Sequence, residues 1–260
     1  MTTFFRTFLA VGQDGLRLIA TAVLPVLFPF FVITSLILNL TNATHPWLVS
    51  VLAYCSGYPN GARLTQDLYS QQRISLPQAQ QLIITTSTPS PFFVIATAGV
   101  VFLHEIKLGC AIFLCAIIGA ILNGYLWRPT KKLKQTYLTS THTINQPSQN
   151  ILTAFSNALT SATNAIVNVC GIVLFFYIAA RLCLLPPIIA GLLEMTTGVA
   201  TTTNPLLIQF FVTFGGLSVA MQQQIFMQKF QIKFYTYFAY KFTHAVLACG
   251  LLSVYLLFLY

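Results

Sequence analysis

The chain has 260 residues; 56% of them are hydrophobic, only 7% are charged, and the formal net charge is +9. A soluble domain carries about 25% charged residues, and the four carboxylates of this chain cannot cover a water-soluble surface of this size. The solvent for most of the chain must therefore be lipid, which excludes a cytosolic enzyme, a secreted disulfide-rich domain and a nucleic-acid-binding module.

The first long apolar run covers residues 16–40, after an expected interfacial lead-in at residues 1–15. About 20 apolar residues suffice to cross a bilayer, so this run is long enough to span it. Pro25 and Pro29 lie inside the run, and each removes a backbone donor. We therefore expect a kinked or broken helix.

The next segments are short and interrupted. Residues 47–56 are apolar but too short to span alone, and they end in the turn-forming string SGYPNG. Residues 75–86 start with a capping-box pattern and predict a short amphipathic helix lying at the membrane interface. The string TTSTPSP at residues 85–91 predicts a break, because it contains two prolines. Apolar segments at residues 92–103 and 108–127 follow it.

A polar, basic connection at residues 128–150 leads to a second long run at residues 151–185, which is polar at first and then apolar. Pro186 and Pro187 end this run. The remaining apolar pieces, in chain order, are residues 188–195 with Glu194 near their end, residues 206–221 with Gly215 and Gly216 in the middle, and residues 234–260.

The order of these segments repeats, since each half has a long run, a half-length piece ending in Ser/Thr-Gly, a polar stretch and broken apolar helices. Aligning Gly57 with Gly198 gives an offset of 198 − 57 = 141 residues. Paired short or interrupted segments point to the central site of a transporter. We predict an all-α, polytopic transmembrane helical bundle of two similar halves, residues 1–128 and 151–260, with re-entrant or broken helices and a cytoplasmic connection at residues 129–150.

The distribution of basic residues predicts the topology. The cluster at residues 128–134 should be cytoplasmic, because short cytoplasmic loops carry an excess of Lys and Arg. For residues 188–203, both crossing and re-entry remain open. In the first half, Arg6, Arg17, Arg63 and Arg73 share the cytoplasmic side if the segments 16–40, 47–62, 89–103 and 108–127 all cross.

The polar residues inside these apolar segments are the candidates for binding a substrate. Glu194 is the one acid within an apolar segment of the second half, and intramembrane ionisable residues usually face a cavity, a partner or a substrate. Broken helices expose backbone donors that only protein or a wet cavity can satisfy. The expected substrate-binding residues are Ser56, Gly57, Asn60, Arg63, Ser87, Thr88, Ser90, Glu194, Thr197, Gly198, Asn204, Gly215, Gly216 and Gln222.

Each candidate also has a structural interpretation. Glu194 can be a protonated or arginine-paired structural residue, residues 56–63 a cytoplasmic turn, and the Gly215-Gly216 pair a close helix contact. A catalytic reading rests on the string GLSVA at residues 216–220 and on His244 in another span. That string lacks the strand–turn–helix context of a nucleophile elbow, so we expect no enzyme. The cysteines lack metal-binding spacing, and no metal or cofactor is expected.

Five strings, in order, resemble the YlbJ-type sporulation integral membrane proteins: TAVLPVLFPFFVITSLI, SGYPNGARL, SLPQAQQL, GLLEMTTG and FGGLSVAMQ. That family belongs to the nucleoside-recognition (Gate) group, whose segments also occur in nucleoside transporters and ferrous-iron transport proteins. The resemblance implies a multi-pass protein of the bacterial plasma membrane whose substrate is not established. It marks as motif residues Ser56, Gly57, Pro59, Gly61, Glu194, Gly198, Gly215, Gly216 and Gln222.

Together these observations predict a transporter that moves a small polar or anionic solute by alternating access. The solute would bind backbone groups at the breaks, while Glu194 accepts hydrogen bonds or a coupling proton. The expected partners are the lipid bilayer and an unknown small solute, without nucleic acid; a homo-oligomer or a second membrane protein stays open. The alternatives are a non-transporting scaffold for envelope or spore assembly and an intramembrane serine hydrolase.

Overall fold

The computed structural model describes residues 2–41, 46–128 and 150–258, and every regular element in these ranges is helical. The expectation of an all-α protein is thereby confirmed. Most of the basic connection at residues 129–150 lies outside the described residues. Four described helices are long and apolar enough to cross a membrane, or five if the bent first pair counts as one span.

The first long run is a bent helix. α1 (Thr2–Leu18) passes through a π-helical turn, η1 (Ile19–Val23), into α2 (Leu24–Leu40), and the two straight parts meet at 43°. Pro25 lies in the first turn of α2, where its missing N–H costs nothing. The expected interruption by proline is confirmed, although it falls just before Pro25 rather than at Pro29.

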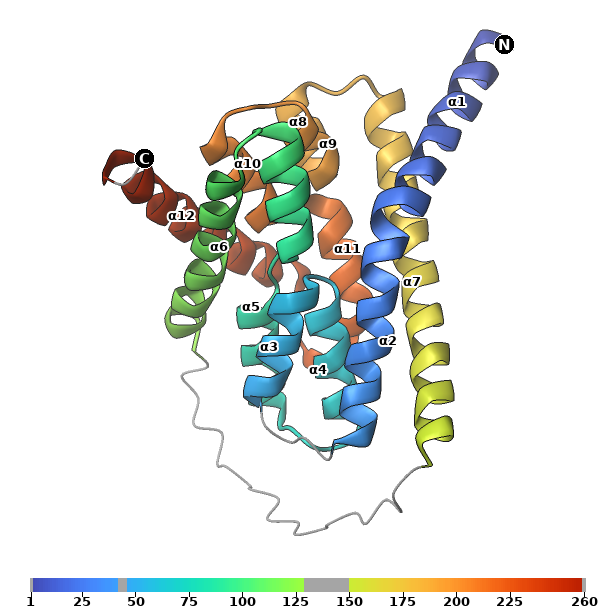
Figure 1. Ribbon diagram of the computed structural model, residues 1–260, viewed down its shortest axis with the longest axis vertical. Helices are drawn as coiled ribbons and strands as arrows, with labels where there is room; N and C mark the ends of the chain where they lie inside the picture. The colour runs from blue at the N-terminus through green and yellow to red at the C-terminus, as the bar shows by residue number, and fades with distance from the viewer. Residues whose placement is uncertain (1, 42–45, 129–149, 259–260) are drawn as a thin grey trace.

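The half-length piece of the first half forms a helical hairpin. α3 (Pro46–Ser56) and α4 (Asn60–Ser70) pack against each other and are joined by a turn at residues 57–59. In Figure 1, α3 rises from the lower end of the molecule and α4 returns to it. Residues 47–62 therefore do not form one continuous crossing segment, which was the condition for Arg6, Arg17, Arg63 and Arg73 to share one side. Gly57 allows the chain to reverse at this turn, because it adopts a φ of +73° that favours glycine. The Tyr58-Pro59 bond in the same turn is cis.

The next helices form a crossing with a break. α5 (Leu76–Thr86) begins with the expected capping box of Ser75 and Gln78. After residues 87–90 the chain continues into the π-helix η2 (Phe92–Phe102) toward the upper end of Figure 1, and α6 (Ile106–Leu126) returns to the lower end. The amphipathic character expected for residues 75–86 is confirmed, because Ala79 and Ile83 of the apolar face are fully buried, and the interfacial position stays a prediction.

The second half begins with the 32-residue helix α7 (Ile151–Leu182), which runs from the lower to the upper end and packs along α2 (Figure 1). α8 (Pro187–Leu193) and α9 (Met195–Ala200) form a second hairpin at the upper end. This hairpin shape favours re-entry of residues 188–203 over crossing. The remaining elements are α10 (Pro205–Phe214), α11 (Gly216–Met227), η3 (Gln228–Phe230) and α12 (Phe234–Phe258).

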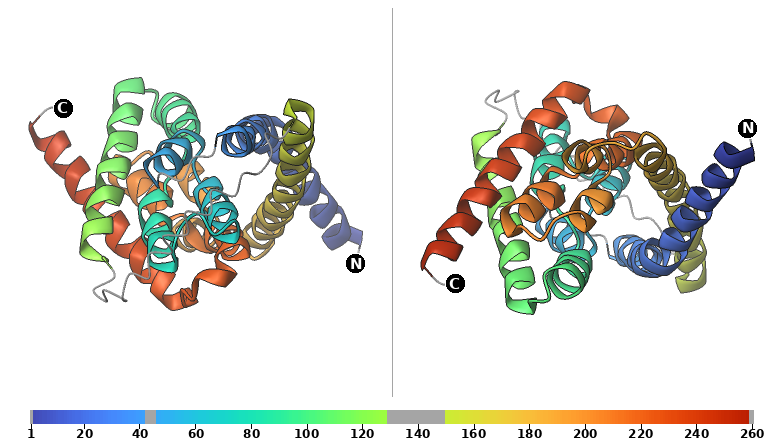
Figure 2. Two further views of the ribbon diagram at one scale, coloured as in Figure 1. Left: turned by 90° about the horizontal axis from the view of Figure 1, so that it is seen from below. Right: turned by 90° about the horizontal axis from the view of Figure 1, so that it is seen from above.

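The ends of the helices do not follow the charge-based topology. α1, which carries Arg6 and Arg17, lies at the end of the molecule opposite to the one where α6 ends, as Figure 1 shows. The two views along the long axis in Figure 2 show α1, α2 and α7 together at one side of the bundle. The prediction that these two arginines share the side of Arg128 is wrong.

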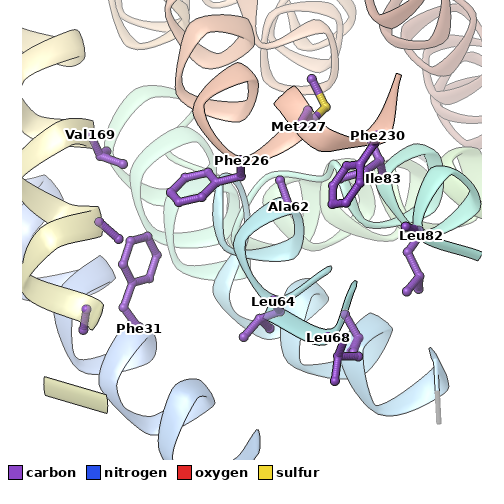
Figure 3. Packing of buried hydrophobic residues seen from close by; sticks show 14 of the residues in the cluster. Phe31, Ala62, Leu64, Leu68, Leu82, Ile83, Val169, Phe226, Met227 and Phe230 are labelled. Carbon is purple, nitrogen blue, oxygen red and sulfur yellow. The ribbon is translucent and has the colours of Figure 1, made fainter. Parts of the chain in front are cut away.

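The packing fits a lipid environment outside and a dense core inside. Large apolar side chains point outward from the long helices, among them Leu114, Val167 and Phe175, each more than half exposed. The core cluster is built where α2, α4, α5, α7 and α11 meet. Figure 3 shows side chains from each of these helices, including Phe31, Ala62, Ile83, Val169 and Phe226.

Candidate functional site

The interruptions of the helices meet in the interior of the bundle. The turn of the first hairpin is bonded to the break after α5, since the N–H of Tyr58 donates to the carbonyl of Thr88 at 2.8 Å. The hydroxyl of Tyr58 donates to the carbonyl of Val212, near the end of α10, at 2.6 Å. It also lies 2.7 Å from the sulfur of Met195, which follows Glu194 in the second hairpin. Tyr58 thus connects three breaks.

Glycine makes these contacts close. A Cβ atom on Gly57 would overlap the backbone of Ser90, and one on Gly216 would lie 2.8 Å from the carbonyl oxygen of Leu192. Both glycines have a positive φ, +73° and +72°. Each hairpin therefore presses its backbone against a broken helix of its own half, an approach that larger residues would prevent.

Glu194 lies between α8 and α9 and is 3% exposed. Its carboxylate accepts hydrogen bonds from the backbone N–H groups of Thr196 and Thr197, at 3.0 and 2.7 Å, and from the hydroxyl of Thr197 at 2.9 Å. It therefore acts as the N-cap of α9, and Thr197 supports it. A carboxylate at a helix start is also favoured by the helix dipole. This arrangement holds the second hairpin tip in shape.

A second polar cluster surrounds the break after α5. The hydroxyl of Ser87 receives a hydrogen bond from Gln223 and lies 3.1 Å from the hydroxyl of Tyr237. The ammonium group of Lys241 donates to the carbonyl of Ser87 at 2.7 Å and lies 5.4 Å from the centre of the Tyr58 ring. All of these side chains are buried, and Lys241 is only 2% exposed. The cluster brings a positive charge to the meeting point of the breaks.

Several polar atoms at this depth have no hydrogen-bond partner among the described residues. They include Oγ1 of Thr88, which is fully buried, and Oε1 of Gln223 beside Ser87. Buried polar groups in proteins are nearly always paired, and an unpaired group loses its hydration without compensation. The break after α5 therefore has donors and acceptors to which a polar solute could form hydrogen bonds.

Arg63 belongs to a separate network below the first hairpin turn. Its guanidinium donates to Asn60 Oδ1 at 3.0 Å, to the carbonyl of Phe31 at 2.8 Å and to Ser161 Oγ at 3.2 Å. The amide of Asn60 in turn donates to Ser56 Oγ at 2.8 Å. Arg63 thus joins α4 to α2 and α7, and most of its donors are occupied.

Beside Arg63, a polar cleft of about 450 Å³ opens between α4 and α7. Asp67 lines it one helical turn beyond Arg63, and its carboxylate has no hydrogen-bond partner in the described part of the chain. One face of the membrane helix α7 also lines the cleft with polar side chains: Asn157, Thr160, Ser161, Asn164 and Asn168. Polar side chains within a membrane span usually face another helix, the bundle interior or a water-filled cavity.

The other expected site residues have local roles. Ser90 Oγ accepts from the N–H of Phe93 at 3.2 Å and so caps η2. Gln222 is buried and donates to Ser218 Oγ at 3.3 Å. Gly215 ends α10 with a φ of +81°, and Gly198 packs against Gly191.

Asn204 is exposed and caps α10 through the N–H groups of Leu206 and Leu207. It therefore lies apart from the buried cluster around Ser87.

The comparisons with known proteins agree with the resemblance drawn from the five strings. The Sporulation integral membrane protein YlbJ of Bacillus subtilis (strain 168) is 22% identical to this chain over 304 aligned residues. The alignment covers 91% of this chain and 74% of that protein. The chain is similar to YlbJ. No protein-family model matches the chain, and no solved structure matches it.

The similarity to YlbJ confirms the YlbJ-type resemblance, whereas the Gate assignment stays a prediction. The chain is an integral, multi-pass membrane protein, as the long apolar helices and the similarity to YlbJ both indicate.

Four residues of the buried site lie outside the set expected from the sequence: Tyr58, Gln223, Tyr237 and Lys241. Lys241 carried a usable signal, because it is a charged residue inside the apolar run 234–260 and satisfies the same rule that selected Glu194. Tyr58 lies within a string that was singled out, but its hydroxyl partners are 137 and 154 residues away.

Proposed function

We propose that this protein is a transporter of a small polar or anionic solute in the bacterial plasma membrane and that it works by alternating access. The observation that supports the proposal most strongly is the contact between the two helical hairpins, at which Tyr58 meets Met195 in the interior. Discontinuous helices that meet near the midplane are the usual construction of a transporter's central site.

The directions of the helices support an inverted repeat of two halves. The α3/α4 hairpin enters from the lower end of Figure 1 and the α8/α9 hairpin from the upper end. The broken crossings α5–η2 and α10–α11 run in opposite directions, and so do the final helices α6 and α12. Two halves of opposite orientation around one site allow that site to open to either side of the membrane in turn.

The polar cleft between α4 and α7 supports an aqueous approach from one side. It reaches Arg63, which is bonded to Asn60 next to the first hairpin turn. Above this network, the bonds of Tyr58 to Thr88 and Val212 close the interior. Opening toward the opposite side would require these bonds to break while the cleft closes.

The role expected for Glu194 can be tested by solute flux. Proteoliposomes with purified wild-type protein, Glu194→Gln or Glu105→Gln are compared for uptake of a solute panel. Glu105 is the matched control, because it also caps a helix start, that of α6, by accepting from Lys107 N–H at 3.1 Å, but it lies in an inter-helix turn. We expect uptake to fall with Glu194→Gln and to stay unchanged with Glu105→Gln. If both variants take up every solute as the wild-type protein does, Glu194 has no role in transport.

The name of the relative favours a link to sporulation as the setting of this activity. A non-transporting scaffold for envelope or spore assembly is the second candidate, and the same similarity supports it. The two differ in where substitutions act, because a scaffold tolerates changes at Glu194 and Lys241 and is sensitive at its outer surface. Sporulation of a strain that carries the variants tests this difference.

The geometry gives little support to a serine hydrolase. Ser218 accepts a hydrogen bond from Gln222, and the imidazole Nε2–H of His244 donates to the carbonyl of Ala116 at 2.8 Å. A nucleophile and its base need a direct hydrogen bond of about 2.6–3.2 Å, which these two side chains do not make with each other.

A further inference from the structure

We propose that the central site binds a small organic anion, with its negative group placed against Lys241 at the break between α5 and η2. This inference rests on the transport function proposed above and specifies the charge of the solute. The evidence for it is that the buried ammonium group of Lys241 lies beside unpaired polar atoms and near the first residues of two helices.

The charge of Lys241 lacks a counterion. Its ammonium group donates to the neutral carbonyl of Ser87 and lies over the ring of Tyr58, and no carboxylate contacts it in the described ranges. An ammonium group has three N–H donors, so two remain for another acceptor. Buried charges in proteins are paired with an opposite charge, and here an anionic solute can supply that charge.

Arg63 and Glu194, two other charged groups of the interior, already make several hydrogen bonds. The guanidinium of Arg63 donates to Asn60, Phe31 and Ser161. The carboxylate of Glu194 accepts three hydrogen bonds from its own segment. Of the two buried Lys and Arg side chains in the described ranges, Lys241 therefore keeps more donors for a solute than Arg63 does.

The backbone around Lys241 favours the same charge. α4 and η2, each 11 residues long, begin at the first hairpin turn and at the break after α5, which are joined by the bond from Tyr58 N–H to Thr88. Helix starts carry partial positive charge and unpaired N–H groups, and half-helix starts in transporters face anionic groups of their substrates.

The unpaired side-chain atoms indicate the rest of the solute. The buried hydroxyl of Thr88 can donate to the anionic group, whereas Oε1 of Gln223 can accept from a hydroxyl or N–H group of the same molecule. The site therefore fits an organic anion that also carries a hydrogen-bond donor, and it fits a halide or a neutral polyol less well.

Thermal unfolding of the detergent-purified protein tests the inference with matched probes. Glycerate and glycerol phosphate are the anions with hydroxyl groups, and glycerol and glyceramide are their neutral counterparts. We expect the two anions to raise the unfolding midpoint in a saturable way at millimolar concentration and the neutral compounds to leave it unchanged. Equal stabilisation by the neutral compounds, or no stabilisation by either anion, would overturn the proposal.

Two substitutions link the effect to Lys241. In Lys241→Met the apparent affinity for the anions should fall at least about thirtyfold, because a buried charge pair loses one partner, and Lys241→Arg should restore part of it. Lys233→Met is the control, since Lys233 lies outside the cluster, over the exposed ring of Tyr235. If Lys241→Met binds the anions as tightly as the wild-type protein does, the anions do not bind at Lys241. That result would overturn the proposed site even though the protein binds anions.

Flux measurements separate this inference from the proposed function. If proteoliposomes take up neutral solutes equally well with wild-type protein and Lys241→Met, transport stands and the anion site fails. If the anions stabilise the protein through Lys241 but no solute crosses, the anion site stands and transport fails.

Discussion

The hydroxyl of Tyr58 donates a 2.6 Å hydrogen bond to the carbonyl of Val212, 154 residues further along the chain. This bond joins the turn of the first hairpin to the end of α10, where Gly215 interrupts the helix. Tyr58 is buried, so the carbonyl has no water to replace this donor. The bond is thus a closing contact of the interior site.

Tyr58→Phe should lower the free energy of unfolding by about 1–3 kcal/mol, because a buried carbonyl loses its donor. Thermal unfolding of the purified protein measures the change. Tyr69→Phe is the control, since the ring of Tyr69 packs edge-on against Phe230 and does not reach the site. A loss of equal size in both variants would count against a special contribution of the Tyr58 hydroxyl.

Gly57→Ala should destabilise the protein by more than about 2 kcal/mol. A left-handed backbone costs a residue with a Cβ atom roughly 1–2 kcal/mol, and the added methyl group would also overlap Ser90. Gly171→Ala is the matched control, because Gly171 lies in α7 with no atom within 4 Å of the added Cβ. Folding yield and thermal unfolding of the two variants give the comparison. Equal tolerance of both changes would contradict the close approach of the hairpin turn to the break.

Lys241→Met should raise the stability of the solute-free protein by about 1–4 kcal/mol, because replacing buried charge by a well-packed apolar side chain often stabilises a protein. The thermal midpoint in buffer without organic anions measures this gain. Lys233→Met should leave the midpoint unchanged. A destabilised Lys241→Met protein would mean that the ammonium group holds the native structure together rather than awaiting a ligand.

The cleft between α4 and α7 should contain water. In a background without native cysteines, Asn164→Cys should react rapidly with a hydrophilic maleimide, because the thiolate forms only where water reaches it. Val167→Cys is the control on the same helix, where the native side chain is 64% exposed on a surface that we assign to lipid. Labelling in proteoliposomes followed by mass spectrometry compares the two. Equal rates, or no reaction at residue 164, would contradict a wet cleft.

Much of the helical pattern could be predicted from the sequence because its causes are local. Proline, glycine and hydroxyl-rich strings mark interruptions wherever they occur, and residues 57, 87–90, 194 and 215 all lie at or beside breaks in the structure. A run of 25 apolar residues likewise has few alternatives to a membrane helix.

The direction of the chain after a break could not be predicted, because contacts between distant segments decide it. Residues 47–62 have almost the length of a span, yet the chain turns back at Gly57, and the returning helix α4 packs closely against Thr86 of α5 at Gly61. The charge of Lys241 inside an apolar run could have been noticed in the sequence, but its place in the site could not. Its importance depends on its contact with Ser87, 154 residues away, and on a depth that the composition of α12 does not reveal.

Alternating access is tested most directly by thiol reactivity on the two sides of the site. Asn164→Cys reports on the cleft near the first hairpin, and Met195→Cys reports on the tip of the second hairpin. Both are measured in oriented proteoliposomes with a membrane-impermeant maleimide, with and without glycerol phosphate. If access alternates, the solute should change the two reaction rates in opposite directions. Rates that change together, or that stay constant while the solute is taken up, would contradict it.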